Sequence, residues 1–307
     1  WLSGLSATLS SSSPYITIID GSANIPNAAT LATVNNNADL FQVVVGGSVP
    51  QNEVVEFKVD LTNGTYTRTD YFKITLNTDY INLEENLVAT TITSKGKIGH
   101  NDANNSVGLG FTYNAMQLLY EAGFMIGDGT NRVADVVRDG LSQNQGLAST
   151  YNVTLSPPFK SAKDLYGIFS DYPISNPMGL RIDHYAYAYP NSPDDKYVIV
   201  LYKIENTSST TLNNLYAGIF ADWDIKNPNL NKAAYDATRK MGYVYAIDND
   251  SAYAAIKVLS ATPANNYSLD LDGSGGVNAN GGGFTIAEKY TTLSTLRGNA
   301  GGALGED

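Results

Sequence analysis

Along most of the chain, apolar residues form short runs or alternate with polar ones, and Gly, Pro, Asn and Asp separate these runs. Such a pattern predicts β-strands of ordinary length and little helix. In the first quarter of the chain the predicted strands cover residues 5–10, 15–19, 40–45, 54–61 and 66–76. Asn63-Gly64, between the last two, is a strong hairpin signal. Short strands at this spacing predict an antiparallel sandwich of the immunoglobulin type.

A polar stretch with three acidic residues, 77–85, separates this part from the rest, and we place the domain boundary there. The expected fold is all-β, with two antiparallel β-sandwich domains and very little helix. We expect an immunoglobulin-like sandwich at 1–78, a linker at 79–86, a larger sandwich at 87–297 and a glycine-rich tail at 298–307. Such a tail frays in a free monomer, so we expect a contact, for example with a neighbouring copy, to hold it.

The second domain repeats the strand pattern over a longer stretch. Its predicted strands cover residues 87–93, 107–113, 117–126, 132–137, 165–169, 180–189, 241–247, 252–258 and 284–290. The polar stretch 141–152 is expected to be a loop. Two short helices are expected, at 233–240 and 286–297, so the residues from 286 to 290 are assigned both ways.

The most specific feature of the sequence lies in the middle of this domain. Two apolar runs, residues 197–204 and 215–220, flank a polar connection rich in Asn, Ser and Thr, and we expect them to form a central hairpin. The second run leads directly into Asp222-Trp223-Asp224. In a continuing strand the two carboxylates would lie on one side and the indole on the other.

Composition narrows the class of protein. Of 307 residues only 16% are charged, Tyr occurs 21 times and Cys is absent. This profile suits an extracellular β-protein, and the lack of Cys excludes disulfides, zinc–thiolate sites and thiol nucleophiles. The net charge of −11 disfavours binding to nucleic acids and anionic membranes and makes calcium a suitable partner. No apolar run reaches about 18 residues, so we expect no membrane insertion. Because the first residue is Trp1, we expect a processed product or a fragment of a larger polypeptide.

Two loops carry the oxygen-bearing side chains that calcium prefers. The first loop follows the strand that ends at Asp222, and its candidate ligands are Asp222, Asp224, Asn227, Asn229 and Asp236. Its alternative role is to cap the turn through hydrogen bonds to the main chain. The second resembles the start of an EF-hand loop, with Asp270, Asp272 and Ser274 at ligand positions, but Gly281 stands where a bidentate acid is required. Its alternative is a plain glycine-rich loop, and calcium is the one cofactor expected.

No recognisable motif assembles residues for catalysis. The two histidines, His100 in a loop and His184 in a predicted strand, do not have the spacing of a metal triad. The chain has neither a Gly-x-Ser-x-Gly elbow nor a phosphate-binding glycine loop, and nothing singles out a carboxylate pair. We therefore expect no enzymatic activity in this chain.

A row of tyrosines lies on one face of the predicted strand at 180–189. Tyr185, Tyr187 and Tyr189 alternate there with small residues and with His184. Such a row can bind carbohydrate or protein. It can also simply cover one face of a sheet, since aromatic residues make good strands.

Several stretches resemble a known protein region. Residues 5–20 (LSATLSSSSPYITIID) are similar to the immunoglobulin-like repeats that follow protease domains in large secreted proteins of the Bacteroidetes/Ignavibacteria group. Four later stretches resemble the β-rich regions downstream of subtilisin-like (S8) peptidase domains in that group: 108–111, 119–127, 133–138 and 218–224. The resemblance covers most of the chain, but the subtilisin signatures His-Gly-Thr-His and Gly-Thr-Ser-Met are absent. It implies the non-catalytic part of such a protein and transfers no catalytic residue.

These observations lead to one expected function and two alternatives. The expected function is that of a non-catalytic extracellular structural or interaction protein that self-assembles into a filament or surface layer. One alternative is the accessory C-terminal region of a secreted subtilisin-like serine peptidase, and the other is a carbohydrate-binding β-sandwich. The expected partners are accordingly further copies of the chain, an attached protease domain, or carbohydrate, and the expected location is the cell exterior or surface.

Overall fold

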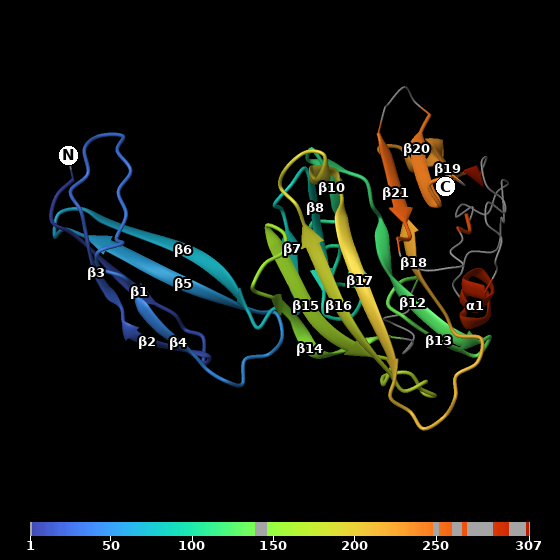
Figure 1. Cartoon of the computed structure of the whole chain (residues 1–307). Helices are drawn as coiled ribbons and strands as arrows, with labels where there is room; N and C mark the ends of the chain where they lie inside the picture. Colours follow the sequence, from blue (N-terminus) through green and yellow to red (C-terminus); the bar gives the residue numbers. More distant parts are fainter. Residues whose placement is uncertain are drawn as a thin grey trace. The chain divides into compact units, whose positions relative to one another are not determined.

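The chain divides into two compact units, Trp1–Asp79 (unit 1) and Tyr80–Asp307 (unit 2) (Figure 1). The computed structural model describes residues 2–138, 146–236, 238–247, 252–259, 266–268, 285–294 and 305–306. These residues form 22 strands, one α-helix and two short 3-10 helices, which confirms the expected all-β class. No helix in the described ranges is long and apolar enough to cross a membrane.

Unit 1 consists of a four-stranded and a two-stranded antiparallel sheet. The larger sheet has the order β3-β1-β5-β6 and contains β1 (Leu5–Ser10), β3 (Ser22–Ile25), β5 (Glu53–Thr62) and β6 (Thr67–Leu76). The smaller sheet pairs β2 (Ile16–Asp20) with β4 (Gln42–Val45). The hairpin predicted from Asn63-Gly64 joins β5 to β6, and Gly64 adopts the positive φ of 89° that such a turn requires.

The core of unit 1 is small. Leu9, Val55 and Phe57 are its buried members, and the side chains packed against them are Ile16, Ile18, Phe41, Val59 and Leu76. They come from both sheets, so the two sheets form the layers of a sandwich. Because the second layer has only two strands, it covers only part of the inner face of the first.

Unit 2 is built around an eight-stranded sheet. Its path runs β11-β10-β8-β9-β12-β13, while β18 also pairs with β12 and β7 with β8. The strands are β7 (Tyr80–Leu83), β8 (Val88–Thr93), β9 (Lys97–Ile98), β10 (Phe111–Tyr113), β11 (Met116–Gln117), β12 (Glu121–Gly129), β13 (Arg132–Asp135) and β18 (Tyr216–Asp222). The stretch 79–86, expected as a linker, therefore contains a strand of unit 2, and Leu83 is fully buried there.

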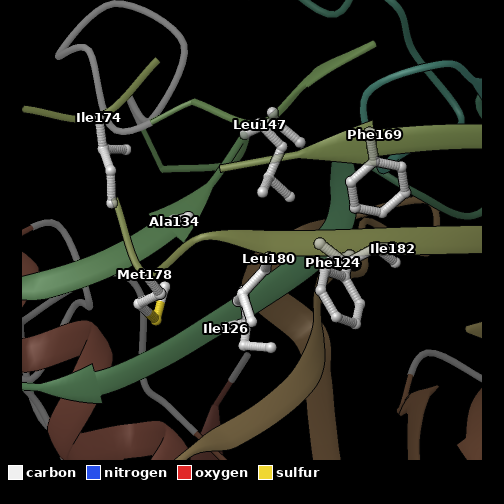
Figure 2. Packing of buried hydrophobic residues seen from close by; sticks show 10 residues of the cluster. Phe124, Ile126, Ala134, Leu147, Phe169, Ile174, Met178, Leu180 and Ile182 are labelled. Atoms are coloured by element: carbon white, nitrogen blue, oxygen red, sulfur yellow. The ribbon is translucent and has the colours of Figure 1, made fainter. Parts of the chain in front are cut away.

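A four-stranded sheet packs against this large sheet. It contains β14 (Ala148–Leu155), β15 (Lys163–Ser170), β16 (Leu180–Ala188) and β17 (Val198–Asn206), in that order. Figure 2 shows Phe124 and Ile126 of β12 close to Leu180 and Ile182 of β16 in the core between the two sheets. The loop expected at 141–152 is wrong from Ala148 onward, because Val153 is buried and β14 pairs with β15.

The central hairpin predicted from residues 197–204 and 215–220 is wrong. Strand β17 pairs with β16, whereas β18 pairs with β12 in the other sheet. The polar connection therefore crosses from one layer of the sandwich to the other, and Thr207 holds its start through a main-chain hydrogen bond of 2.8 Å to Gly179. A nine-residue polar connection is compatible with a hairpin or a crossing, and the pattern of polarity does not distinguish them.

A third sheet, β21-β20-β19-β22, follows near the C-terminus. It contains β19 (Asn231–Asp236), β20 (Met241–Ala246), β21 (Tyr253–Lys257) and β22 (Gly305–Glu306). The helix expected at 233–240 is therefore wrong: Ala233 and Ala234 favour a helix locally, but pairing with β20 buries them in a strand. In the expected tail, Gly305–Glu306 pair with β19 of the same chain.

The single α-helix of the described residues, α1, covers Ile286–Ser294. It confirms the short helix predicted from residue 286, and the competing strand at 284–290 is wrong. The two 3-10 helices, Asp194–Lys196 and Pro228–Leu230, lie in connections between strands.

The packing of His184 in β16 gives a direct test of the core. Its imidazole is 3% exposed and faces Gly167 of the neighbouring strand, and burial lowers its pKa to about 4. A Cβ at Gly167 would lie 2.3 Å from Nε2 of His184 and 3.1 Å from Cα of Val153. The glycine therefore makes room for the ring.

We expect Gly167→Ala to lower the free energy of unfolding by about 1–3 kcal/mol, because the added methyl group overpacks this site. Denaturant unfolding followed by circular dichroism measures the change. Gly47→Ala is the control, since Gly47 is exposed and no atom of the described residues lies within 4 Å of a Cβ at that position. Equal stability of the two variants would contradict the packing described here.

Candidate functional site

The Asp222-Trp223-Asp224 sequence lies at the end of β18, where the chain leaves the large sheet. The Trp223 indole is 7% exposed and contacts the ring of Phe111 edge-on, with 5.4 Å between the ring centroids. Ile225, two residues further along the chain, is completely buried. The tryptophan is thus a core residue that joins the large sheet to the third sheet.

The turn after β18 is held together by one asparagine side chain. Asn231 accepts a hydrogen bond from the Ile225 amide (2.8 Å) and donates to the carbonyls of Ile225 (2.9 Å) and Asn227 (2.8 Å). Its amide group is therefore fully engaged with the main chain. Capping, the alternative to calcium binding, is realised here by Asn231, whose amide oxygen is also a candidate calcium ligand.

The remaining candidate calcium ligands are dispersed. Asn229 is exposed, and the carboxylate of Asp236 accepts a hydrogen bond from the Arg239 amide (2.9 Å). Within the described ranges, no three His, Cys, Asp or Glu side chains are placed to hold a metal ion. Asp270, Asp272 and Ser274 lie outside the described residues. Calcium binding therefore stays a prediction without support from this geometry.

The structure instead gathers five buried charged residues near β12, which we call the buried charge cluster: Glu121, Asp135, Arg138, Asp222 and Lys289. Glu121 and Asp222 are cross-strand partners on β12 and β18. Glu121 also accepts a hydrogen bond from the Arg138 amide at 3.1 Å. Buried charges are expensive unless they are paired, so this grouping is a strong constraint on the fold.

Asp222 has the most perturbed acid–base behaviour in the cluster. Burial, together with the charge of Asp224, raises its pKa to about 7, although Arg138 acts in the opposite direction. The nearest guanidinium nitrogen of Arg138 lies 3.8 Å from the carboxylate, too far for a strong hydrogen bond. The same guanidinium lies 5.3 Å from the centre of the Phe220 ring.

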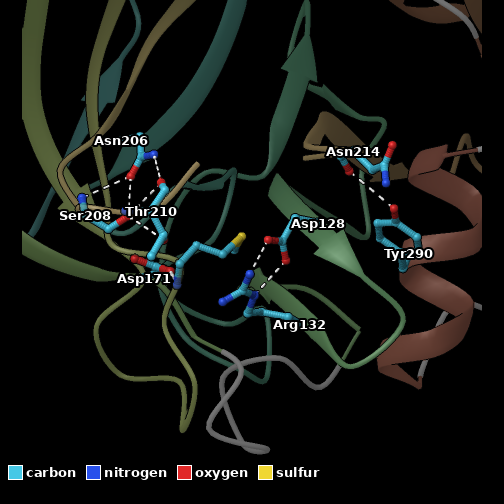
Figure 3. Close-up of polar contacts among 9 residues, drawn as sticks. Asp128, Arg132, Asp171, Asn206, Ser208, Thr210, Asn214 and Tyr290 are labelled. Atoms are coloured by element: carbon cyan, nitrogen blue, oxygen red, sulfur yellow. Dashed lines mark hydrogen bonds and ion pairs between the residues drawn. The ribbon is translucent and has the colours of Figure 1, made fainter. Parts of the chain in front are cut away.

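Lys289 of helix α1 and Asp135 are the most deeply buried members of the cluster. Nζ of Lys289 lies 2.9 and 3.1 Å from the two carboxyl oxygens of Asp135, and both side chains are completely buried. Tyr290, the next residue in α1, donates a hydrogen bond of 3.2 Å to the Asn214 carbonyl (Figure 3). These contacts dock α1 on β12, β13 and β18.

Sequence reasoning missed this cluster because its members are far apart in the chain. Asp135 and Lys289 are separated by 154 residues, and the residues around each give no local signal of a partner. The one available signal was a lysine within a short helix of mixed polarity. Lysine is usually exposed to solvent, so this position did not indicate a buried partner.

The cavity nearest to Trp223 is small. Its volume is about 110 Å³, and its lining includes Phe220, Trp223, Val244 and Asn266. Sites for drug-sized ligands usually measure roughly 300–1,000 Å³. The size of this cavity therefore indicates a gap in the packing of the core and not a binding site for a ligand of that size.

The tyrosine row has the predicted phase: Ala186 and Ala188 are buried, whereas Tyr185 and Tyr187 are half-buried on the other face. The rings of Tyr151, Tyr166 and Tyr185 follow one another across three strands, with centroids 5.8 and 4.9 Å apart. At this spacing each ring covers part of its neighbour. The arrangement favours a role in covering the sheet and leaves few ring faces for a sugar.

An exposed apolar edge is the main surface feature of unit 1. Strand β6 is an edge strand, and Phe72 and Ile74 on its inner face are 43% and 45% exposed. Their partners on β5, Phe57 and Val55, are buried on the same face. The uncovered part of the sandwich therefore coincides with this edge.

Asp222 gives a prediction on pH dependence. Its pKa is about 7 in the folded state and near 3.8 ordinarily, so between these values the folded state holds more protons than the unfolded state. Stability from this group is present at low pH and is lost as the pH rises through about 7. We therefore expect melting temperature to fall between pH 5 and 8, and to fall less in Asp222→Asn.

Asp236→Asn is the control, because hydrogen bonds from Arg239 lower the pKa of Asp236 and move its titration below this window. Its profile should run parallel to that of the wild type. A parallel profile for Asp222→Asn as well would rule out the raised pKa.

Comparison with known proteins does not extend this description. No family model, no curated protein and no solved structure matches the chain. The resemblance to regions downstream of subtilisin-like peptidases stays a prediction, and the function has to be argued from the geometry of the two units.

Proposed function

We propose that the chain is a non-catalytic extracellular structural protein that associates with copies of itself through the edge of unit 1. The observation that carries this proposal is β6, a ten-residue edge strand with half-exposed apolar side chains on the face that forms the core. A long edge with exposed apolar residues is a template for an added strand. Soluble monomers normally cover or shorten such edges.

The second layer of the sandwich in unit 1 also has exposed apolar residues on its inner face. In β4, Val43 and Val45 are 39% and 46% exposed, although their partners Ile18 and Ile16 pack against the core. Both edge strands thus present apolar residues that belong to the interior of a larger sandwich. An added strand would gain a free energy of about 25 cal/mol for each Å² of apolar surface that it removes from water.

The charges on β6 do not oppose an added strand. Arg68 pairs with Asp70 at 2.7 Å, and Lys73 lies 3.6 Å from Glu56. These exposed pairs contribute little to stability, but they place opposite charges side by side. An approaching strand therefore meets balanced charge and an apolar row.

The order of residues along β6 fits an antiparallel copy of itself. With a two-fold axis at Ile74, Phe72 lies opposite the partner's Leu76, and Lys73 lies opposite the partner's Thr75. Moving the axis to Asp70 would place two carboxylates opposite each other, which is destabilising. The register at Ile74 joins three apolar positions on the inner face and opposes no like charges.

Further growth requires a second kind of contact. Gly305–Glu306 pair with the edge of β19, so this edge also accepts an added strand. If the same pairing is made between copies, dimers formed through β6 become linked into a filament. The exterior location rests on the composition, with few charges, many tyrosines and no Cys.

The experiment is to measure association by sedimentation velocity from about 1 to 100 µM and to inspect the samples by negative stain. We expect a concentration-dependent dimer or larger species. Ile74→Lys places two ammonium groups at the axis and should weaken association at least tenfold, which corresponds to about 1.4 kcal/mol. A wild-type chain that stays monomeric throughout, with no fibres, would falsify the proposal.

Two further variants test the register. Val54→Lys is the matched control, because Val54 is 56% exposed on β5, which is not an edge strand, and association should remain. Ile74→Asp should dissociate the dimer alone but associate when mixed with Ile74→Lys. Failure of this mixture to associate would contradict a two-fold contact at Ile74.

A further inference from the structure

The contact between Lys289 and Asp135 has the geometry of a reacting pair. Both carboxyl oxygens of Asp135 lie within 3.1 Å of Nζ, so the carbon between them is in van der Waals contact with the nitrogen. Both side chains have no exposed area. Reacting atoms held at such a distance reach effective concentrations far above those in solution.

The surrounding main chain orients both groups. Nζ also lies 3.0 Å from the carbonyl oxygens of Val137 and Arg138. In the neutral amine, two N–H groups can donate to these carbonyls while the lone pair points at the carboxyl carbon. The Val137 amide donates to Oδ1 of Asp135 at 3.0 Å, where it stabilises negative charge that develops on this oxygen.

Burial favours the neutral form of the Asp135 carboxyl. It raises the pKa of Asp135 to about 6 despite the neighbouring ammonium group, and the charge of Glu121 acts in the same direction. Transfer of one proton from Lys289 to Asp135 gives an amine and a carboxylic acid with no net change in charge. A dry interior favours this neutral pair relative to water.

We propose that Lys289 and Asp135 form an intramolecular amide bond between Nζ and the carboxyl carbon. After the proton transfer, the bond from Nζ to the carboxyl carbon forms and the bond from that carbon to the hydroxyl oxygen breaks. The hydroxyl group leaves with one amine proton as water. The reaction is a condensation with no oxidation or reduction, and it requires only the two side chains.

The bond would link α1 covalently to the end of β13. These residues are 154 positions apart, in a chain that contains no Cys and therefore no disulfide. A cross-link over such a distance restricts the unfolded chain strongly. For the extracellular protein proposed above, this bond would be a covalent cross-link that does not depend on redox conditions.

The test is the intact mass of the purified chain under denaturing conditions, after incubation of the folded protein at neutral pH. We expect a mass 18 Da below that of the sequence. Proteolysis followed by fragmentation should yield one branched peptide that contains both Asp135 and Lys289, which separates this bond from water loss elsewhere. A mass equal to that of the sequence would show an ion pair only and overturn the proposal.

Variants locate the bond without relying on stability. Lys289→Arg keeps the charge but lacks the amine and should have its full sequence mass. Asp135→Asn offers a carboxamide, so its product should lose ammonia, about 17 Da by the same atom balance, and form the same amide. Water loss that persists in Lys289→Arg would assign the modification to another site. Association through β6 is measured separately, so either proposal can fail alone.

Discussion

The burial of β12 on both faces is the constraint on which unit 2 depends. From Glu121 to Gly127 every residue of this strand is buried, and the strand pairs with β9, β13 and β18. Close neighbours require its glycines: a Cβ at Gly123 would lie 2.8 Å from Val137, and one at Gly127 would lie 2.7 Å from Val133. A charged residue is tolerated in such a buried strand only when neighbouring residues neutralise its charge or form hydrogen bonds with it.

The buried charge cluster follows from that constraint. Glu121 at the start of β12 is buried beside Asp222, and Arg138 lies close to both. Asp135 on the neighbouring strand is matched by Lys289, which α1 delivers from far along the chain. We therefore attribute the position of α1 mainly to the contacts of Lys289 with its buried acceptors, and less to the weakly apolar surface of the helix.

Local pattern located most of the strands, although not β14 or β19, and it did not identify which strands pair. Alternation placed His184 and the tyrosines of β16 on the correct faces, and Asn63-Gly64 marked a real hairpin. The crossing between β17 and β18, by contrast, depends on which edge strand is available, which no local signal records. The alanines of β19 favoured a helix until pairing with β20 outweighed their propensity. The contact of Lys289 with Asp135 was out of reach for the same reason, since only the assembled sheet brings the two together.

In the proposed filament, the position of Lys289 would determine how unit 2 carries tension. Load that enters unit 2 at β7 and leaves it at the C-terminal end of α1 would have to pass between β13 and α1. With Lys289 joined to Asp135, the force passes directly from β13 to α1. The chain between them, whose ends are 154 positions apart and which spans roughly 500 Å if fully extended, then lies outside the loaded path. Strands β14 to β21 are in that loop and would stay folded while the rest of the chain bears the force.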